Sequence, residues 1–166
     1  MDSTLDRLAA AAFLLVSVVL LAAMPAWRMD DRPPVDAYAE SAPAFLARAE
    51  AFAARHATGA ETDGLPVVAP PPGDVPVVAR RYQFWPALEL EAGHTYRLHV
   101  ASIDTVHSVA IDGHELLLIP GEVRVIEVRP SAPLTLQCGE YCGLGHNKMR
   151  GSIRLRPDAS APPAAR

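Results

Sequence analysis

The stretch HTYRLHVASIDTVHSVAIDGHELLLIPGEVRVIEV, residues 94–128, alternates apolar and polar side chains over most of its length. The alternation stops at Asp112-Gly113 and at Pro120-Gly121, two pairs that are typical of tight turns. A period of two places successive side chains on opposite faces of a β-strand. Similar short runs lie on both sides of this stretch. The sequence therefore predicts a mainly β domain, a Greek-key barrel or sandwich, over residues 75–157.

A loop near the C-terminal end of this domain carries side chains with metal-binding chemistry. The segment QCGEYCGLGHNKMRG has the spacing Cys138-x3-Cys142-x3-His146-x2-Met149. A further histidine, His107, begins a β run in the stretch quoted above. Two thiolates, two imidazoles and a thioether are soft ligands, which favour copper over magnesium or calcium. Zinc fits less well, because a thioether adds little to a structural zinc site.

The cysteine pair leaves three arrangements open. A mononuclear blue-copper site needs one thiolate, so Cys138 would have no role in it. Its ligands would be His107, Cys142, His146 and Met149. A disulfide would close a short loop and would gain little chain entropy. A binuclear site, in which both thiolates bridge two coppers and a loop carbonyl is a further weak ligand, gives every residue a role and is favoured.

The loop resembles the CuA loop of cytochrome c oxidase subunit II, whose pattern is C-x-E-x-C-G-x-x-H-x-x-M. Residues 104–108 (DTVHS) match the D-x-x-H-S of that family, and Pro120-Gly121 matches its P-G turn. The resemblance covers about residues 75–156. It implies a cupredoxin fold in which Cys138 and Cys142 bridge the two coppers.

The resemblance also implies how the other ligands divide between the metals. His107 and Met149 would bind one copper, and His146 and the backbone carbonyl of Glu140 would bind the other. In many members of the family the side chain at the Glu140 position also binds a magnesium ion, at the boundary with the catalytic subunit.

The function that the resemblance implies is electron entry into a haem-copper terminal oxidase. A soluble cytochrome c or cupredoxin would donate electrons through the CuA centre to the haem-bearing catalytic subunit I, which reduces oxygen. The chain itself would transfer electrons only and would have no catalytic residue. A CuA-containing nitric oxide reductase subunit is the first alternative, and a periplasmic copper carrier or assembly protein is the second. Nitrous oxide reductase, which carries a similar loop, is a much larger chain.

An aromatic run precedes the first histidine ligand. Residues 80–86 read RRYQFWP and loosely resemble the aromatic segment of subunit II. The resemblance implies that Phe84 and Trp85 lie near the copper site and form part of an electron-transfer surface. The alternative is that they are core aromatics at the end of a strand.

An uncharged apolar block occupies residues 8–27. It is long enough to cross the hydrocarbon core of a bilayer, so it predicts a transmembrane helix that contacts lipid and follows a cytoplasmic stub, 1–7. A signal peptide is less favoured, because the run exceeds the usual apolar length of such peptides. A short chain with one helix resembles the ba3-type branch. In that branch an acidic residue near the start of the single helix, at the place of Asp6, is associated with a proton-entry path. The alternative is that Asp6 is an ordinary charged residue flanking the helix.

The remaining segments predict a short amphipathic helix and a Pro-rich linker over 28–74, and a disordered tail over 158–166. The net charge of −4 comes without a block of Lys or Arg, which argues against nucleic acid as a partner. Because the donor is periplasmic, the expected location is the bacterial inner membrane. The chain would cross it once, with the copper domain in the periplasm.

Overall fold

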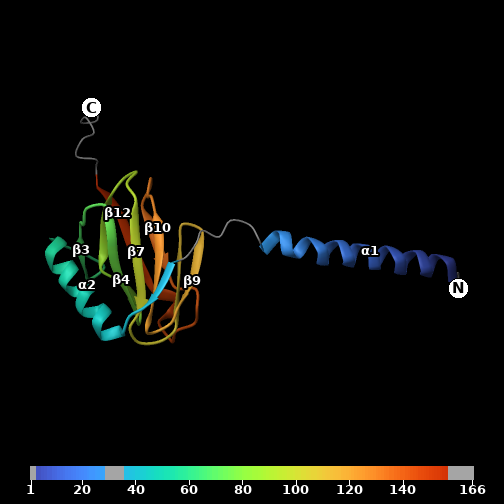
Figure 1. Cartoon of the computed structure of the whole chain (residues 1–166), viewed down its shortest axis with the longest axis horizontal. Coiled ribbons are helices and arrows are strands. Elements are labelled where there is room, and N and C mark those ends of the chain that lie inside the picture. The colour runs from blue at the N-terminus through green and yellow to red at the C-terminus, as the bar shows by residue number, and fades with distance from the viewer. Residues whose placement is uncertain (1–2, 29–35, 157–166) are drawn as a thin grey trace, which may run out of the picture. The chain divides into compact units, whose positions relative to one another are not determined.

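A computed structural model describes residues 3–28 and 36–156 of the chain. It divides the chain into two compact units, one of which contains helix α1 (Ser3–Arg28) and the other the β domain (Figure 1). The first part of the predicted linker segment, residues 29–35, and the predicted tail, 158–166, lie outside the described residues.

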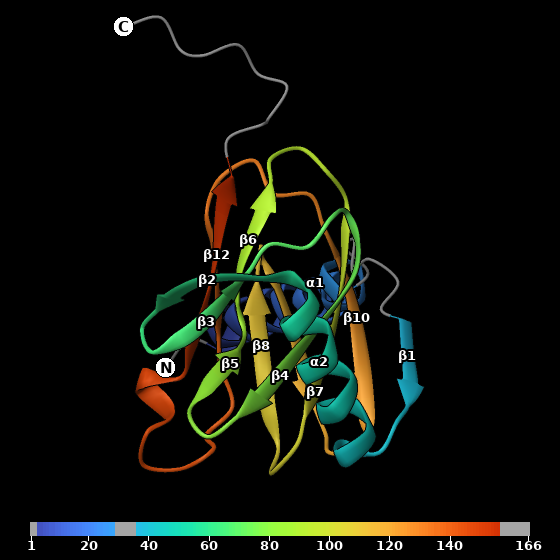
Figure 2. The ribbon, with the colours of Figure 1, turned by 90° about the vertical axis from the view of Figure 1, so that its left-hand side faces the viewer.

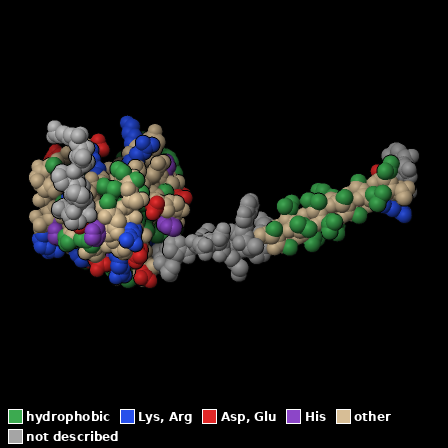
Figure 3. All heavy atoms as spheres, turned by 90° about the horizontal axis from the view of Figure 1, so that it is seen from above, with side chains coloured by type: hydrophobic (Ala, Val, Ile, Leu, Met, Phe, Trp, Pro, Cys, Tyr) green, Lys and Arg blue, Asp and Glu red, His purple; other side chains and the backbone are tan. Residues whose placement is uncertain are grey.

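Helix α1 has the length and composition of a membrane span. Its candidate span is Thr4–Ala23, with a mean hydropathy of 2.1. Figure 3 shows hydrophobic side chains along the visible face of this helix, and side chains such as Phe13 and Leu15 are exposed. A lipid-facing helix has this character, and a signal sequence near an N-terminus has it as well.

The second unit is a twelve-stranded sheet within residues 36–156. Its strands are β1 (Asp36–Ala39), β2 (Ala57–Thr62), β3 (Leu65–Val68), β4 (Gly73–Arg80), β5 (Gln83–Trp85), β6 (Ala87–Glu91), β7 (Tyr96–Ser102), β8 (His107–Ile111), β9 (His114–Leu118), β10 (Glu122–Val128), β11 (Leu134–Gln137) and β12 (Arg150–Arg156). The main path of pairing is β1-β10-β7-β4-β5-β12-β11-β8-β9, while β6 pairs with both β12 and β3, and β2 with β3. The predicted mainly β fold is confirmed.

Both turns predicted from the quoted stretch are present. Strands β8 and β9 form an antiparallel hairpin in which His107 pairs with Leu118. Its turn residues, Asp112 and Gly113, have φ of 49° and 78°. Positive φ at both central residues is what a tight two-residue hairpin turn requires, and Asp and Gly tolerate it.

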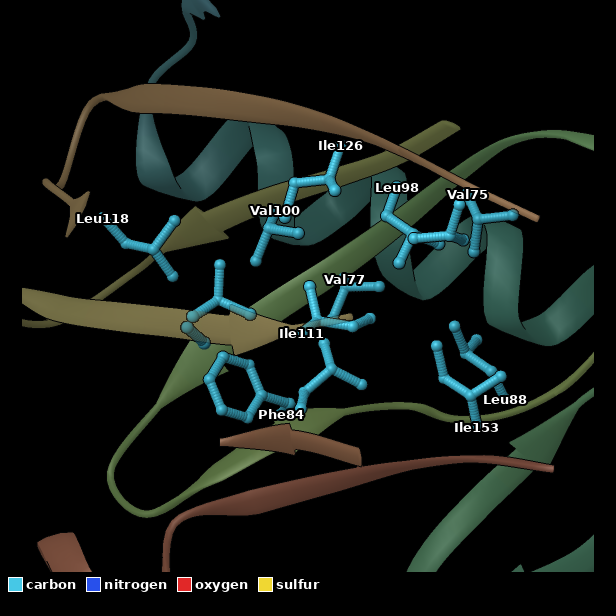
Figure 4. Packing of buried hydrophobic residues seen from close by; sticks show 14 of the residues in the cluster. Val75, Val77, Phe84, Leu88, Leu98, Val100, Ile111, Leu118, Ile126 and Ile153 are labelled. Carbon is cyan, nitrogen blue, oxygen red and sulfur yellow. The ribbon is translucent and has the colours of Figure 1, made fainter. Parts of the chain in front are cut away.

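Inward-facing side chains from different strands fill the interior. Figure 4 shows Val77 of β4, Val100 of β7, Ile111 of β8 and Ile126 of β10 pointing into one apolar space. All four are at least nine-tenths buried. Burial of a side chain of this size stabilises a fold by about 1.5–3 kcal/mol. The core therefore holds the strand ends, from which the metal-binding loop projects, in fixed positions.

The predicted amphipathic helix is α2 (Ala42–His56), which has proline in its first turn. Phe45, Ala49 and Ala53 are spaced by four residues and are its buried positions. Figure 2 shows α2 lying over β4 and β7. This helix covers one face of the sheet and does not contribute to the loop.

The Pro-rich linker is a wrong prediction for residues 57–68. These residues form β2 and β3, and β3 pairs in parallel with β6. Val67 and Val68 are buried, and Asp63 and Gly64 take positive φ in the turn between the two strands. Gly64 marks the turn here, whereas Gly59 and Pro66 lie within the strands. The segment joins the sheet because the distant strand β6 supplies hydrogen bonds to β3. The β domain accordingly begins with β1 and not at residue 75.

Candidate metal centre

The loop between β11 and β12 is held at the end of the sheet where β8 begins. Gln137 of β11 pairs with Ala110 of β8, and Leu136 pairs with Gly151 of β12. The connection from β4 to β5 lies at the same end (Figure 2). This strand order brings together segments that are far apart in the sequence.

The two cysteine sulfurs are the centre of the site. Cys138 Sγ and Cys142 Sγ lie 3.9 Å apart. Each sulfur has one imidazole beside it, because His107 Nδ1 is 3.8 Å from Cys138 Sγ and His146 Nδ1 is 3.9 Å from Cys142 Sγ. The structure thus brings together the four strong ligands that the sequence predicted.

Each sulfur also has one weak ligand in reach. The carbonyl oxygen of Glu140 lies 3.2 Å from Cys138 Sγ. The thioether sulfur of Met149 lies 3.7 Å from Cys142 Sγ. The two sulfurs therefore have matching neighbours, one imidazole and one weak donor each.

These distances fit a metal centre and not a disulfide. A disulfide would place the sulfurs about 2.05 Å apart, whereas both cysteines are free thiols at 3.9 Å. Two metal–thiolate bonds of about 2.3 Å can span that separation. One ligand atom each from His107, Cys138 and Cys142 lies within 4.8 Å of the others, and all three side chains are buried. Soft sulfur and imidazole donors in this number suit copper.

Asp104 orients the first imidazole. Its Oδ1 lies 2.8 Å from His107 Nε2, and its carboxylate also accepts the backbone N–H groups of Arg81 and Thr105. A carboxylate only accepts, so Nε2 carries the proton and Nδ1, on the side of Cys138 Sγ, has its lone pair available to a metal ion. Burial alone would raise the pKa of Asp104, but the N–H groups of Arg81 and His107 hold that pKa below its usual value.

The Cys142 thiol has a raised pKa. Burial is the main cause, and the neighbouring sulfur of Cys138 adds to it. Thiolates are the form that binds metals, so a metal ion has to displace a proton from this side chain.

The outer part of the loop is covered by the ring of Tyr82. A Cβ atom at Gly143 or Gly145 would collide with that ring, and Gly143 also has a φ of 132° that disfavours other residues. Glycine is therefore needed at both positions for the loop to fold under Tyr82.

Two side chains hold the backbone of the segment that contains both cysteines. Gly139 N–H donates to Ser108 Oγ at 2.8 Å, and Ser108 Oγ donates to Glu115 Oε1 at 2.9 Å. At the other end, Arg81 Nε donates to the carbonyl oxygen of Cys142 at 3.0 Å.

The other residues predicted from the sequence lie in varied surroundings. Phe84 is fully buried in the core beside Gly151, and Trp85 is half-buried among apolar side chains. Asp6 lies in the first turn of α1, and the side chain of Glu140 is exposed.

The sequence did not reveal the residues that support the ligands. Arg81, Tyr82, Ser108 and Glu115 all contact the loop. Ser108 belongs to the D-x-x-H-S match, and Arg81 and Tyr82 belong to the aromatic run, but neither pattern indicated these contacts. The glycines of the loop indicated tight folding but not which side chains would cover it.

The site is a candidate soft-metal centre on a mainly β domain, and the chain is similar to cytochrome c oxidase subunit 2, as its loop predicted. The protein of that name from Thermus thermophilus is 30% identical over 73 residues, which are 42% of this chain and 54% of that protein. A second protein of that name, from a particular strain of the same species, is 29% identical over 73 residues, 42% of this chain and 44% of that protein. The chain thus spans about half the length of these curated relatives. No family model matches it.

Solved structures with a similar shape include oxidase subunits and a rusticyanin. The periplasmic domain of subunit II of cytochrome oxidase from Bradyrhizobium japonicum is 17% identical, with a TM-score of 0.47, and the match covers 51% of this chain and 84% of that one. A chain of a heme-copper terminal oxidase dimer is 20% identical with a TM-score of 0.47, covering 93% and 100%. Reduced rusticyanin is 17% identical with a TM-score of 0.47, covering 74% and 100%.

Proposed function

We propose that this chain is the electron-entry subunit of a haem-copper terminal oxidase and that its loop holds a binuclear CuA centre. One observation carries the proposal: the neighbours of the two sulfurs match. A mononuclear site would use Cys142 and leave Cys138 without a role, yet Cys138 has an imidazole at 3.8 Å and a carbonyl at 3.2 Å. Because both sulfurs would bridge, nearness to one sulfur does not assign a ligand to one copper. The pairing of His107 with Met149, and of His146 with the Glu140 carbonyl, follows from the family resemblance.

The residues of the chain would prepare the site for electron transfer. The copper pair, when bound, supplies one-electron redox chemistry. His107, Cys138 and Met149 are buried, so they exclude water from the inner side of the centre. Strand ends fix their backbone, which keeps the ligands in place in both oxidation states.

The outer side of the centre is where a donor would approach. His146 is the half-buried ligand, and Tyr141 beside it and Leu144 are exposed. A soluble cytochrome c or cupredoxin would dock at this face. Phe84 and Trp85 would then lie behind the centre, and exposed Tyr82 would be the aromatic of that run at the surface.

The membrane-related parts of the proposal concern α1. This helix would be retained as a single anchor in the bacterial inner membrane, with the β domain in the periplasm and the catalytic subunit beside it. Asp6 would lie on the cytoplasmic side, where a proton path could begin. The exposed carboxylate of Glu140 would face the catalytic subunit and could bind magnesium there.

The test is purification of the tagged full-length chain from native membranes. The expected result is a co-purifying haem-bearing subunit whose oxygen consumption, driven by reduced cytochrome c, is lost in Cys142→Ser. His94→Ala is the matched control, because this surface histidine contacts Glu91 and lies outside the ligand set. A partner that reduces nitric oxide and not oxygen would identify the alternative enzyme, and no haem-bearing partner at all would contradict the proposal.

A further inference from the structure

The turn between β4 and β5 touches both parts of the metal site through one residue. The backbone N–H of Arg81 donates to Asp104 Oδ2 at 2.9 Å. The other oxygen, Asp104 Oδ1, accepts a hydrogen bond from His107 Nε2. The side chain of Arg81 donates from Nε to the carbonyl oxygen of Cys142 at 3.0 Å. Arg81 thus connects the segment that carries His107 to the loop that carries Cys142.

We propose that the guanidinium of Arg81 is a positioning group for the metal-binding loop, and that it raises the reduction potential of the centre. This inference rests on the proposed function. A hydrogen bond from a charged donor is stronger than one between neutral groups, so it fixes the Cys142 carbonyl and with it the bridging thiolate. An added electron is stabilised by a positive charge that is hydrogen-bonded to a ligand residue.

The next residue of the turn acts on the same loop. The Tyr82 ring packs over Gly143 and Gly145, directly after the residue whose carbonyl Arg81 binds. The turn therefore contacts three of four consecutive loop residues, 142–145, from one side. A single hydrogen bond in this arrangement restrains a segment that has no strand pairing of its own.

Arg80 provides a matched control for Arg81. It carries the same charge one residue earlier, but its guanidinium carbon lies 6.0 Å from the centre of the Trp85 ring, away from the carbonyl of Cys142. The Arg81 side chain is exposed to solvent, so its long-range field is screened. An effect that depends on the contact should therefore appear in R81Q and not in R80Q. Both variants keep the backbone N–H that binds Asp104.

The first measurement needs no metal. Backbone hydrogen exchange of residues 139–148 is followed in the metal-free full-length chain in detergent, for the wild type, R81Q and R80Q. We expect exchange in this segment to become roughly threefold to tenfold faster in R81Q, with R80Q at the wild-type rate, because the loop loses one restraint. Equal exchange in R81Q and the wild type overturns the inference, whatever metal the chain binds.

The second measurement is a redox titration of the copper-loaded full-length chain, followed by its visible absorption. The reduction potential should fall in R81Q, and R80Q should shift it by much less. Equal shifts in the two variants would show a long-range field and overturn the role of the contact. If the wild-type chain binds no copper, the proposed function and the effect on the reduction potential are both overturned. If hydrogen exchange is still raised in R81Q alone, the positioning role of Arg81 remains supported.

Discussion

The two ends of the metal site are built in different ways. His107 begins β8 and Cys138 follows β11, so we call these two residues the strand half. Cys142 and His146 form the loop half, whose regular structure is the short 3-10 turn His146–Lys148. Met149 lies between this turn and β12. The strand half takes its positions from sheet pairing, whereas the loop half depends on Tyr82 and Arg81, which lie on another part of the chain.

This difference shows what the fold supplies before a metal arrives. Cys138, His107 and their support from Asp104 are fixed by the sheet. The end of the loop is joined to it by the hydrogen bond from Cys138 N–H to the Met149 carbonyl at 3.2 Å. We therefore expect metal binding to order the loop half more than the strand half, and the predictions below test this difference.

The largest effect is expected from Cys138→Ser, compared with Cys142→Ser. In a binuclear centre both sulfurs bridge, so either substitution should remove at least one copper and abolish the shared-electron signal. The check is copper per chain by elemental analysis, together with electron paramagnetic resonance. If Cys138→Ser kept a normal single-copper blue site while Cys142→Ser lost all copper, the site would be mononuclear, with Cys142 as its thiolate and no role for Cys138.

The next effect concerns the cover of the loop half. Gly145→Ala should lower the free energy of unfolding by about 1–3 kcal/mol, because the new Cβ would enter the Tyr82 ring. Tyr82→Ala in the same chain should recover much of that loss, so a double-mutant cycle should show coupling between the two sites. Gly145 has a φ of −96°, which other residues also adopt, so the expected loss comes from the contact with Tyr82 and not from backbone strain. Additive effects of the two substitutions would contradict the packing described.

A smaller effect is expected from the support of the strand half. Glu115→Ala removes the acceptor of the Ser108 hydroxyl, which in turn accepts the Gly139 N–H. The loss should be about 0.5–1.5 kcal/mol, as for one ordinary hydrogen bond, because strand pairing still holds Cys138. Thermal unfolding of the metal-free chain measures it. Hydrogen exchange near residue 139 is compared with exchange at residues 142–148 in the same variant. An equal rise in both segments would show that the strands do not fix the strand half.

The smallest effect lies outside both halves. The hydrogen bond from His99 is the main cause of a lowered pKa of Asp74. A carboxyl with a lowered folded-state pKa stabilises the fold above its unfolded pKa, near 3.8, and this contribution is lost as the pH falls through the folded-state pKa. Asp74→Asn should therefore slightly reduce stability at neutral pH and make it less sensitive to acid. The reduction potential of the copper-loaded chain should not change, and a shift there would mean that this surface network reaches the metal site.

The sequence predicted the features that depend on local spacing. The hairpin turn at Asp112-Gly113 and the ligand loop follow from neighbouring residues, and the structure has both. The strands β2 and β3 were missed because this hairpin joins the sheet only through the pairing of β3 with β6, which lies further along the chain. Arg81 and Tyr82 were missed for the same reason, since their contacts with the loop join positions about sixty residues apart, as the Arg81–Cys142 hydrogen bond shows.

The matching surroundings of the two sulfurs are tested most directly by copper loading of the full-length chain. The measurement is copper per chain combined with the electron paramagnetic resonance spectrum of the oxidised protein. We predict two coppers per chain and a signal in which one unpaired electron is shared by both nuclei. One copper per chain, with the signal of a single isolated centre, would contradict the binuclear site.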